Sequence, residues 1–240
     1  MNKIDRLREM IKESQNIVFF TGAGVSTDSG IKDFRSEDGL YNEKNNYKYP
    51  PEFMLSRTCF YTDVKEFYKF YKDKMNTLKY EPNITHKFIK KLEKEKNVTV
   101  VTQNIDGLHT KAGSKIVYEL HGTVNKNYCL ECGKEYDAEY IFKSIGIPKC
   151  SCGGIIKPKV VLYEESLPDF EFIESEKAIK KADMLIVMGT SLTVYPASGL
   201  VNLFKGKYLV ILNKEKTPYD YKADLVINDK LSKIVKELKK

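Results

Sequence analysis

Several features that would assign a chain to a special class are missing from this sequence of 240 residues. Its longest apolar stretches, such as Met184–Met188, run for about five residues, whereas a membrane-spanning helix needs about 20. The first residues, Met1 to Arg6, show no secretory signal pattern. With 42% hydrophobic and 30% charged residues, the chain has the composition of a globular protein. We therefore expect a cytoplasmic protein of one large domain or two small ones, with no membrane partner.

Long runs of one charge are missing as well. The 40 Lys and Arg residues against 33 Asp and Glu give a net charge of +7, yet no run of five like charges occurs. Much of the excess lies in helical patterns interleaved with Glu, such as Lys87–Lys96, where basic side chains are usually only solvated. No aromatic-and-basic RNA-binding signature is present. The charge therefore names no partner, and we expect no specific nucleic-acid ligand.

Short apolar segments alternate with helical patterns along most of the chain. Apolar strands are expected at Asn16–Phe20, Val98–Thr102, Lys115–Leu120, Lys159–Tyr163, Met184–Met188, Tyr208–Leu212 and Leu225–Ile227. Helical patterns are expected near Ile84–Leu92, Phe170–Ala182, Ala197–Phe204 and Leu231–Leu238. Strands without in–out alternation, separated by helices, predict a parallel sheet that is covered on both faces. The expected fold class is therefore α/β, with a Rossmann-like, doubly wound parallel sheet.

Two stretches interrupt this alternation. Residues 39–80 carry an aromatic stripe at helical spacing, including Phe67, Tyr68 and Tyr71, which is typical of a helix packed against the main domain. Residues 125–155 carry four of the five cysteines. We expect these two stretches, a helical insertion and a zinc module, to form a smaller lobe. The Rossmann-like domain is expected to comprise residues 1–38, 81–124 and 156–240.

Cysteine is scarce, but four of the five cysteines are clustered. Cys129-Leu-Glu-Cys132 and Cys150-Ser-Cys152 are separated by 17 residues, which matches a tetrahedral Zn²⁺ site built from two thiol pairs. Because four thiolates fill the tetrahedron, this zinc would be structural and would leave no position for water. Unrelated buried thiols are one alternative, and a redox Cys-x-x-Cys, disfavoured by the second pair, is the other.

A glycine-containing loop, Gly22-Ala23-Gly24-Val25-Ser26, follows the first expected strand. Glycines at this place let backbone N–H groups approach a pyrophosphate, although Gly-x-Gly turns also occur for steric reasons alone. The dehydrogenase fingerprint is incomplete. Thr27 replaces its third glycine, and no acidic residue stands about 20 residues further on at the end of a second strand. The pattern therefore disfavours simple hydride transfer.

Further polar residues follow the other expected strands. Gln103-Asn104-Ile105-Asp106 comes after one strand and His121-Gly122 after another, where open α/β sheets bind their ligands. A lone histidine is more often a satisfied core residue, but His121, at a strand end beside a glycine, is a candidate base.

Taken together, these motifs resemble those of the sirtuins, which are NAD-dependent protein-lysine deacylases. The matching motifs are Gly22–Ser26, Ser29–Arg35, Thr102–Asp106, His121-Gly122, the two cysteine pairs and Gly189-Thr190-Ser191-Leu192. They occur in the family's order over most of the chain, and the short length resembles that of bacterial or archaeal members.

The resemblance implies NAD as co-substrate and a structural zinc. It implies His121 as the general base on the ribose hydroxyls, and Asn104 as a second catalytic residue, placed with Gln103 at the nicotinamide ribose. The residues implied to contact NAD are Gly22, Ala23, Gly24, Thr27, Asp33, Phe34, Arg35, Gln103, Asn104, Ile105, Asp106, His121, Gly189, Thr190, Ser191, Asn213 and Asp229. The implied metal ligands are Cys129, Cys132, Cys150 and Cys152.

In the implied reaction, the acyl-lysine carbonyl attacks the NAD ribose, and the products are nicotinamide, O-acetyl-ADP-ribose and free lysine. Expected partners are therefore proteins or peptides with acetylated lysine, with nicotinamide as product and inhibitor. The substrate backbone is implied to pair between Lys159–Glu165 and Leu192–Tyr195, near Val161, Tyr163 and Val194.

The chain departs from the family pattern at three places. Lys32 stands where proline is usual, and Glu164 stands where glycine is usual beside the peptide groove. Tyr71 follows Tyr68 where deacylases that prefer succinyl groups have arginine, so negatively charged acyl groups are not expected as substrates.

Two alternatives remain for the function. A mono-ADP-ribosyltransferase or a deacylase of other acyl groups could use the same fold, although direct transfer of ADP-ribose need not activate a ribose hydroxyl. A zinc-ribbon nucleic-acid module joined to a nucleotide-binding fold would leave Gln103–Asp106 and His121 without a role.

Overall fold

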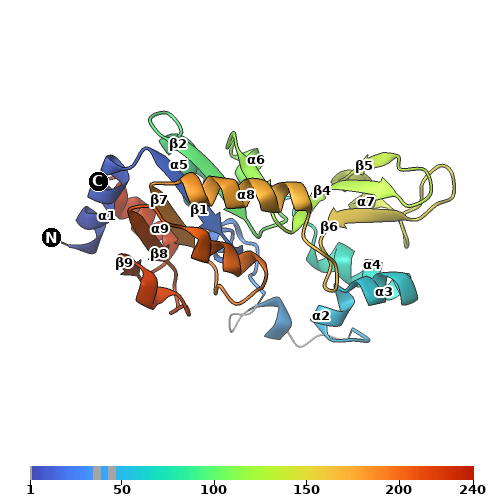
Figure 1. Ribbon diagram of the computed structural model, residues 1–240. Coiled ribbons are helices and arrows are strands. Elements are labelled where there is room, and N and C mark those ends of the chain that lie inside the picture. The colour runs from blue at the N-terminus through green and yellow to red at the C-terminus, as the bar shows by residue number, and fades with distance from the viewer. Residues whose placement is uncertain (1, 35–38, 43–46) are drawn as a thin grey trace.

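The computed structural model describes residues 2–34, 39–42 and 47–240. The larger of the two sheets in these residues is parallel and has six strands. The strands follow the order β3-β2-β1-β7-β8-β9 (Figure 1). Their bounds are β1 (Asn16–Thr21), β2 (Asn97–Thr102), β3 (Val117–Glu119), β7 (Met184–Met188), β8 (Tyr208–Leu212) and β9 (Leu225–Ile227). From β1 the chain runs outward through β2 and β3 and then returns to β7 on the other side of β1. The strand order therefore reverses between β1 and β7, which is where open α/β sheets bind ligands.

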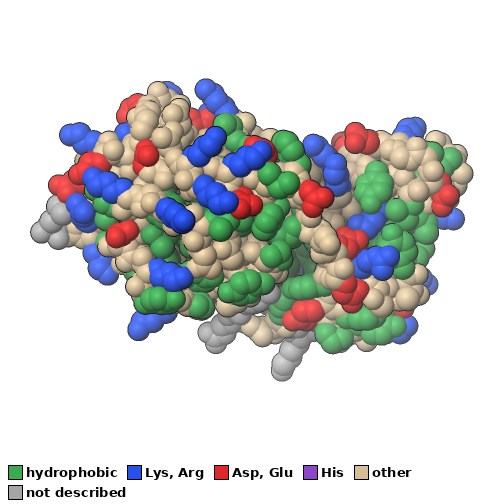
Figure 2. Space-filling model, viewed as in Figure 1, with side chains coloured by type: hydrophobic (Ala, Val, Ile, Leu, Met, Phe, Trp, Pro, Cys, Tyr) green, Lys and Arg blue, Asp and Glu red, His purple; other side chains and the backbone are tan. Residues whose placement is uncertain are grey.

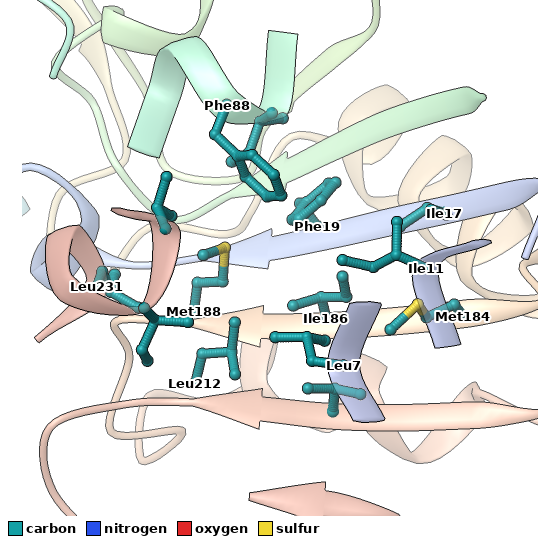
Figure 3. Close-up of a cluster of buried hydrophobic side chains, with 14 of the residues drawn as sticks. Leu7, Ile11, Ile17, Phe19, Phe88, Met184, Ile186, Met188, Leu212 and Leu231 are labelled. Atoms are coloured by element: carbon teal, nitrogen blue, oxygen red, sulfur yellow. The ribbon is translucent and has the colours of Figure 1, made fainter. Parts of the chain in front are cut away.

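Successive residues of the central strands are buried against opposite layers of helices. On one face, Ile17 and Phe19 of β1 pack with α1 (Lys3–Glu13), α5 (Ile84–Leu92) and α9 (Leu231–Leu238), as the close-up in Figure 3 shows. On the other face, Val18 and Phe20 pack with α8 (Asp169–Lys181) and η4 (Ala197–Leu203). Each fully buried side chain of this kind stabilises the fold by about 1.5–3 kcal/mol. The expected doubly wound α/β fold is confirmed.

A smaller lobe lies beside the large sheet, at the right in Figure 1. It contains a three-stranded antiparallel sheet of order β5-β4-β6 and several short helices. The strands are β4 (Gly122–Cys129), β5 (Glu135–Asp137) and β6 (Ile156–Val160). The helices are η3 (Leu40–Asn42), α2 (Pro51–Met54), α3 (Arg57–Thr62), α4 (Val64–Lys74) and α7 (Ala138–Lys143).

The aromatic stripe of α4 packs within this smaller lobe. Phe67, Tyr68 and Tyr71 are buried with Cys129 and other residues of the cysteine-containing segment. Tyr71 stacks on Phe142 of the α7 helix, with ring centroids 5.7 Å apart. The Tyr68 hydroxyl donates a hydrogen bond to the carbonyl oxygen of Ile156. The expectation that the stripe packs against the main domain is therefore wrong, because a helical period identifies the buried face of a helix but not its partner.

One expected strand is also placed differently. The strand expected at Lys159–Tyr163 is found at Ile156–Val160, and it pairs antiparallel with β4 in the smaller sheet. The region expected to begin the last part of the Rossmann-like domain at residue 156 therefore starts with a strand of the smaller lobe.

The surface is mixed in charge. On the face shown in Figure 2, basic and acidic side chains are interspersed, and hydrophobic side chains are visible on both lobes. Every helix in the described ranges is too short or too polar to cross a membrane.

Candidate active site and metal centre

The polar residues singled out from the sequence follow the carboxyl ends of parallel strands, and these ends meet at one edge of the large sheet. The Gly22–Thr27 loop follows β1, Gln103–Asp106 follows β2, and His121 follows β3. Gly189–Ser191 follows β7. Asn213 comes directly after β8, and Asp229 comes two residues after β9.

The glycine loop packs tightly against the loop after β7. The Gly22 N–H donates to the Met188 carbonyl at 3.1 Å, and the Gly24 N–H donates to the Gly189 carbonyl at 2.8 Å. A Cβ on Gly24 would lie 2.8 Å from the Gly189 Cα, and one on Gly22 would lie 2.6 Å from the Thr190 Cβ. Gly22 and Gly24 are therefore required for the close approach of the two loops at the point where the strand order reverses.

A group of buried polar side chains lies beside this loop. The Ser26 hydroxyl donates to Asp106 Oδ2 at 2.6 Å, and Asn104 Nδ2 donates to Ser26 Oγ at 3.2 Å. The Leu108 N–H donates to Asp106 Oδ1 at 2.8 Å. Burial raises the pKa of the Asp106 carboxyl above its ordinary value, although the hydrogen bonds from Ser26 and Leu108 oppose the shift. The group offers amide, hydroxyl and carboxyl functions suited to binding a polar ring substituent.

His121 is half-buried and held by the loop after β2. Its Nδ1 lies 2.9 Å from the Gln103 carbonyl oxygen. Because a carbonyl only accepts, Nδ1 carries the proton in this contact, and Nε2 of the neutral ring carries the lone pair. The His121 carbonyl accepts from the Val161 N–H at 2.8 Å, which places Val161 beside the candidate base. This geometry suits a base acting near an extended segment of chain.

Gln103 also connects the β2 and β7 loops. Its Nε2 donates to Thr190 Oγ1 at 3.0 Å, and its backbone N–H donates to the Thr21 carbonyl at 2.9 Å. Ser191 is exposed and its hydroxyl lies 2.8 Å from Thr193 Oγ1. Gln103 and Thr190, predicted from the β2 and β7 loops, are therefore joined by a direct hydrogen bond.

Other predicted residues have contacts within their own segments of the chain. Phe34 is partly buried beside Tyr41, with ring centroids 5.5 Å apart, and the Asp33 carbonyl accepts from the Leu40 N–H. Asn213 Nδ2 donates to the Glu215 carbonyl at 2.8 Å. The Asp229 carboxylate pairs with Lys233 at 2.5 Å at the start of α9. Arg35 lies outside the described residues.

The residues predicted near the substrate differ in exposure. Val161 and Val194 are half-buried, and Tyr163 is 38% exposed. The Tyr163 hydroxyl lies 2.5 Å from the Tyr41 hydroxyl. This places Tyr163 between the end of β6 and the helical insertion.

Two residues of the site were not assigned a role from the sequence. Ser26 joins Asn104 to Asp106, and its position two residues after the Gly-Ala-Gly turn could have indicated it. Glu119 ends β3, and burial raises the pKa of its carboxyl to about 7. The sequence did contain a signal for Glu119, because this carboxylate comes two residues before the candidate catalytic histidine.

The four predicted cysteines come together at the end of β4. Their sulfur atoms all lie within 4.8 Å of one another, and Cys129 Sγ is 3.5 Å from Cys152 Sγ. None of these thiols is in a disulfide. Four thiolates at Zn–S distances of about 2.3 Å lie roughly 3.8 Å apart in a tetrahedron, so the donor set fits a structural zinc. The expected four-cysteine metal site is confirmed.

The remaining two histidines form a buried pair behind the site. His86 of α5 and His109 of α6 (Leu108–Lys111) have ring centroids 4.7 Å apart. His109 Nε2 lies 3.1 Å from Thr21 Oγ1, and His86 Nδ1 accepts from the Asn83 N–H at 3.3 Å. Burial lowers the pKa of His86 to about 4 and that of His109 well below its ordinary value. Both rings are therefore neutral at pH 7.

This pair leads to a prediction about acid stability. Because both pKa values are lower in the folded chain, the stability that the neutral rings contribute is present above pH 6.5 and is lost as the pH falls towards 4. For His86 the loss amounts to about 3 kcal/mol of unfolding free energy. In NMR spectra, the ring resonances of His86 and His109, assigned with His86→Gln and His109→Gln variants, should not titrate between pH 8 and 5.5. Titration of both near pH 6.5 would contradict the prediction.

The chain has a doubly wound α/β sheet, polar loops where the strand order reverses, and an inserted four-cysteine module. These features are typical of a nucleotide-binding enzyme with a smaller lobe that a metal stabilises. Residues 22–196 match the model of the Sir2 family. The chain is 55% identical over 238 residues to an NAD-dependent protein deacetylase of Clostridium acetobutylicum, covering 98% of this chain and 97% of the relative. The chain belongs to the Sir2 family, the sirtuins.

Solved structures agree with this assignment. A Sir2 structure with a deacetylated p53 peptide and 3′-O-acetyl-ADP-ribose superposes with a TM-score of 0.90 at 36% identity, covering 99% of this chain and 97% of the other. A Sir2 structure with a p53 peptide and NAD+ superposes with a TM-score of 0.84 at 36% identity, covering 99% and 96%. The resemblance inferred from the motifs is confirmed.

Proposed function

We propose that this protein is an NAD-dependent protein-lysine deacetylase that releases nicotinamide, O-acetyl-ADP-ribose and free lysine. Membership of the Sir2 family supports the reaction class. The observation that carries the proposal is the position of His121, between the Gln103 carbonyl and the backbone N–H of Val161. A base at this point lies between the loops assigned to NAD and the segment assigned to the acyl-lysine peptide.

The residues at the sheet edge fit NAD. The loops that carry Gly22–Thr27 and Gly189–Ser191 meet where the strand order reverses, and we assign the pyrophosphate and phosphate contacts to them. Asn104, Ile105 and Asp106 are assigned to the nicotinamide, since buried polar groups on this loop can hydrogen-bond a carboxamide. Asn213 and Asp229 are assigned to the adenosine end.

When bound, NAD supplies the bond between nicotinamide and ribose, whose cleavage accompanies transfer of the acetyl group. His121 then takes a proton at Nε2 from a ribose hydroxyl, because its Nδ1 proton is held by the Gln103 carbonyl. Asn104 and Gln103 orient the ribose. Phe34 is assigned to covering the ribose face and excluding water, and Asp33 and Arg35 of the same motif are assigned only as contacts to NAD.

The peptide is assigned to the segment that carries Val161 and Tyr163 and to the segment that carries Val194. Main-chain pairing along these segments gives affinity with little sequence preference, so acetylated-lysine proteins and peptides of varied sequence are the expected partners. Tyr71 is buried against Phe67 and Phe142, and its phenol ring cannot pair with a substrate carboxylate as a guanidinium would, so neutral acyl groups are preferred.

We further propose that the protein acts in the cytoplasm. We also propose that residues 1–38, 81–124 and 156–240 act as the NAD-binding domain, apart from strand β6, which belongs to the smaller lobe. The helical insertion at 39–80 and the zinc module at 125–155 complete the smaller lobe, to which strand β6 contributes its pairing with β4. The zinc site performs no chemistry in this scheme, because its four thiolates leave no open position.

Incubation of an acetyl-lysine peptide with and without NAD tests the proposal. Deacetylated peptide, nicotinamide and O-acetyl-ADP-ribose should appear together by mass spectrometry, only when NAD is present. Acetyl removal that proceeds equally well without NAD would contradict it. A stable ADP-ribose adduct on protein, with lysine still acetylated, would support the mono-ADP-ribosyltransferase alternative, and a panel of acyl-lysine peptides would reveal preference for another acyl group.

A further inference from the structure

We propose that Glu164 is a positioning residue for the acyl-lysine peptide, because its carboxylate connects the peptide-binding segment Val161–Glu165 to the first turn of α3. The proposal rests on the assignment of this segment to the peptide under the proposed function. It concerns a residue at which this chain departs from the glycine usual in the family.

The segment makes a tight turn in which Glu164 has an unusual backbone conformation. The Glu165 N–H donates to the Leu162 carbonyl at 3.0 Å, and Glu164, the third residue of the turn, has a φ of 72°. This left-handed region favours glycine and costs other residues about 1 kcal/mol or more. Among the described residues, Leu192 is the only other non-glycine residue with a positive φ, at 55°. The two strained residues therefore lie in the two segments assigned to the peptide.

The Glu164 carboxylate is bound by the start of α3. Its Oε2 accepts from the Thr58 N–H at 2.9 Å and from the Thr58 hydroxyl at 2.6 Å. Thr58 is the second residue of α3, and the first N–H groups of a helix have no partner within the helix. These hydrogen bonds, with a smaller contribution from Arg57, hold the pKa of Glu164 below its ordinary value. A glycine at this position would leave the Thr58 groups without this acceptor.

The main chain beside Glu164 is bound to the same part of the insertion. The Tyr163 N–H donates to the Leu55 carbonyl at 3.0 Å, and the Arg57 N–H donates to the Tyr163 carbonyl at 3.0 Å. Tyr163 and Ser56 thus form a parallel bridge. The Glu164 side chain extends this connection by two charge-assisted hydrogen bonds.

The other side of the turn is fixed by a buried ion pair. Glu165 Oε1 lies 3.1 Å from Lys157 Nζ, and Glu165 Oε2 accepts from the Leu162 N–H at 3.0 Å. The turn is therefore held by β6 on one side and by α3 on the other. A segment that is already ordered loses less conformational entropy when a peptide pairs with it, so removal of one connection should weaken peptide binding.

The test compares Glu164→Ala, Glu164→Gly and Thr58→Val with Glu176→Ala, a control at a glutamate of α8 whose carboxylate pairs with Lys180, away from the peptide segments. We expect Glu164→Ala and Glu164→Gly to raise the KM for acetyl-lysine peptide about fivefold to tenfold, and to leave the KM for NAD within about twofold. Thr58→Val, which keeps the backbone donor, should raise the peptide KM less, and its effect should not add to that of Glu164→Ala. The control should match the parent.

Thermal unfolding separates positioning from simple stabilisation. Glu164→Gly relieves the backbone strain, so its melting temperature should be close to that of the parent and above that of Glu164→Ala. Its KM for the peptide should nevertheless remain raised. An unchanged peptide KM in both Glu164 variants would overturn the proposal. Anisotropy of a labelled acetyl-lysine peptide measures binding without turnover. Absence of NAD-dependent deacetylation by the parent protein would therefore count against the proposed function, whereas equal peptide binding by parent and variants would count against the role of Glu164.

Discussion

Replacement of His121 by alanine should lower kcat for NAD-dependent deacetylation at least about a hundredfold, because a positioned general base typically contributes 10²–10⁴-fold. Its Nδ1 is bound to the Gln103 carbonyl at 2.9 Å, so Nε2 is oriented to receive a proton. Removal of the ring deletes this acceptor and its hydrogen bond to the Gln103 carbonyl. The backbone hydrogen bonds from the Gln103 N–H to the Thr21 carbonyl and from the Val161 N–H to the carbonyl of residue 121 remain. Folding and NAD affinity should therefore change little, by thermal unfolding and calorimetry respectively.

The matched control for this variant is His121→Gln. It keeps a hydrogen-bond donor that could reach the Gln103 carbonyl but has no basic nitrogen, so it should be as inactive as the alanine variant. If either variant turned over at near the parental kcat, His121 would have no part in proton transfer. A fall in activity that paralleled a fall in melting temperature would likewise assign it a structural role.

Much of the fold could be predicted because parallel strands covered on both faces have a simple pattern. Met184–Met188 and Tyr208–Leu212 are buried at every position, and both strands were expected at these bounds. At the edge of the sheet the pattern is weaker. Only Val117–Glu119 of the expected Lys115–Leu120 strand is formed, since Ile116 is 46% exposed and the edge strand has one neighbour.

Strand β6 could not be placed from sequence because its pairing is long-range. Ile156–Val160 contains Pro158 and two lysines, which are untypical of a buried strand. The side chain of Lys157 is nonetheless buried, because Glu165 pairs with it from across the turn. Nothing in the local pattern reveals a partner eight residues away.

The candidate site was more predictable than the smaller lobe for a topological reason. Residues that follow parallel strands lie at the same edge of the sheet, whichever strands are neighbours. The sequence alone therefore predicted that the loops of Gly22, Gln103 and His121 lie close together. The aromatic stripe of α4 had no such constraint, and its partner is the cysteine-containing segment. The contact between Glu164 and Thr58 joins two segments 106 residues apart and carries no local signature.

Loss of any one zinc ligand should have the largest effect on stability. Zinc binding to structural sites contributes about 10 kcal/mol or more of apparent free energy, and that energy is available only to the folded lobe. In Cys129→Ala, Cys132→Ala, Cys150→Ala or Cys152→Ala, we expect zinc content to fall from one per chain towards zero. The melting temperature should fall by about 10 °C or more, since a loss of about 1 kcal/mol of unfolding free energy lowers it by about 2–4 °C in a chain of this size.

Cys59 provides the matched control for these variants. It is a buried free thiol of the same lobe but lies outside the metal cluster, so Cys59→Ala tests loss of a buried sulfur without loss of a ligand. It should keep its zinc and lose only about 1 kcal/mol. Full loss of zinc from a ligand variant with an unchanged melting temperature would contradict the structural role of the metal.

Removal of zinc should also affect the peptide site. The α4 aromatics are buried with Cys129, and β4 pairs with β6 just before the peptide segment. Removal of zinc should therefore raise the peptide KM more than the KM for NAD.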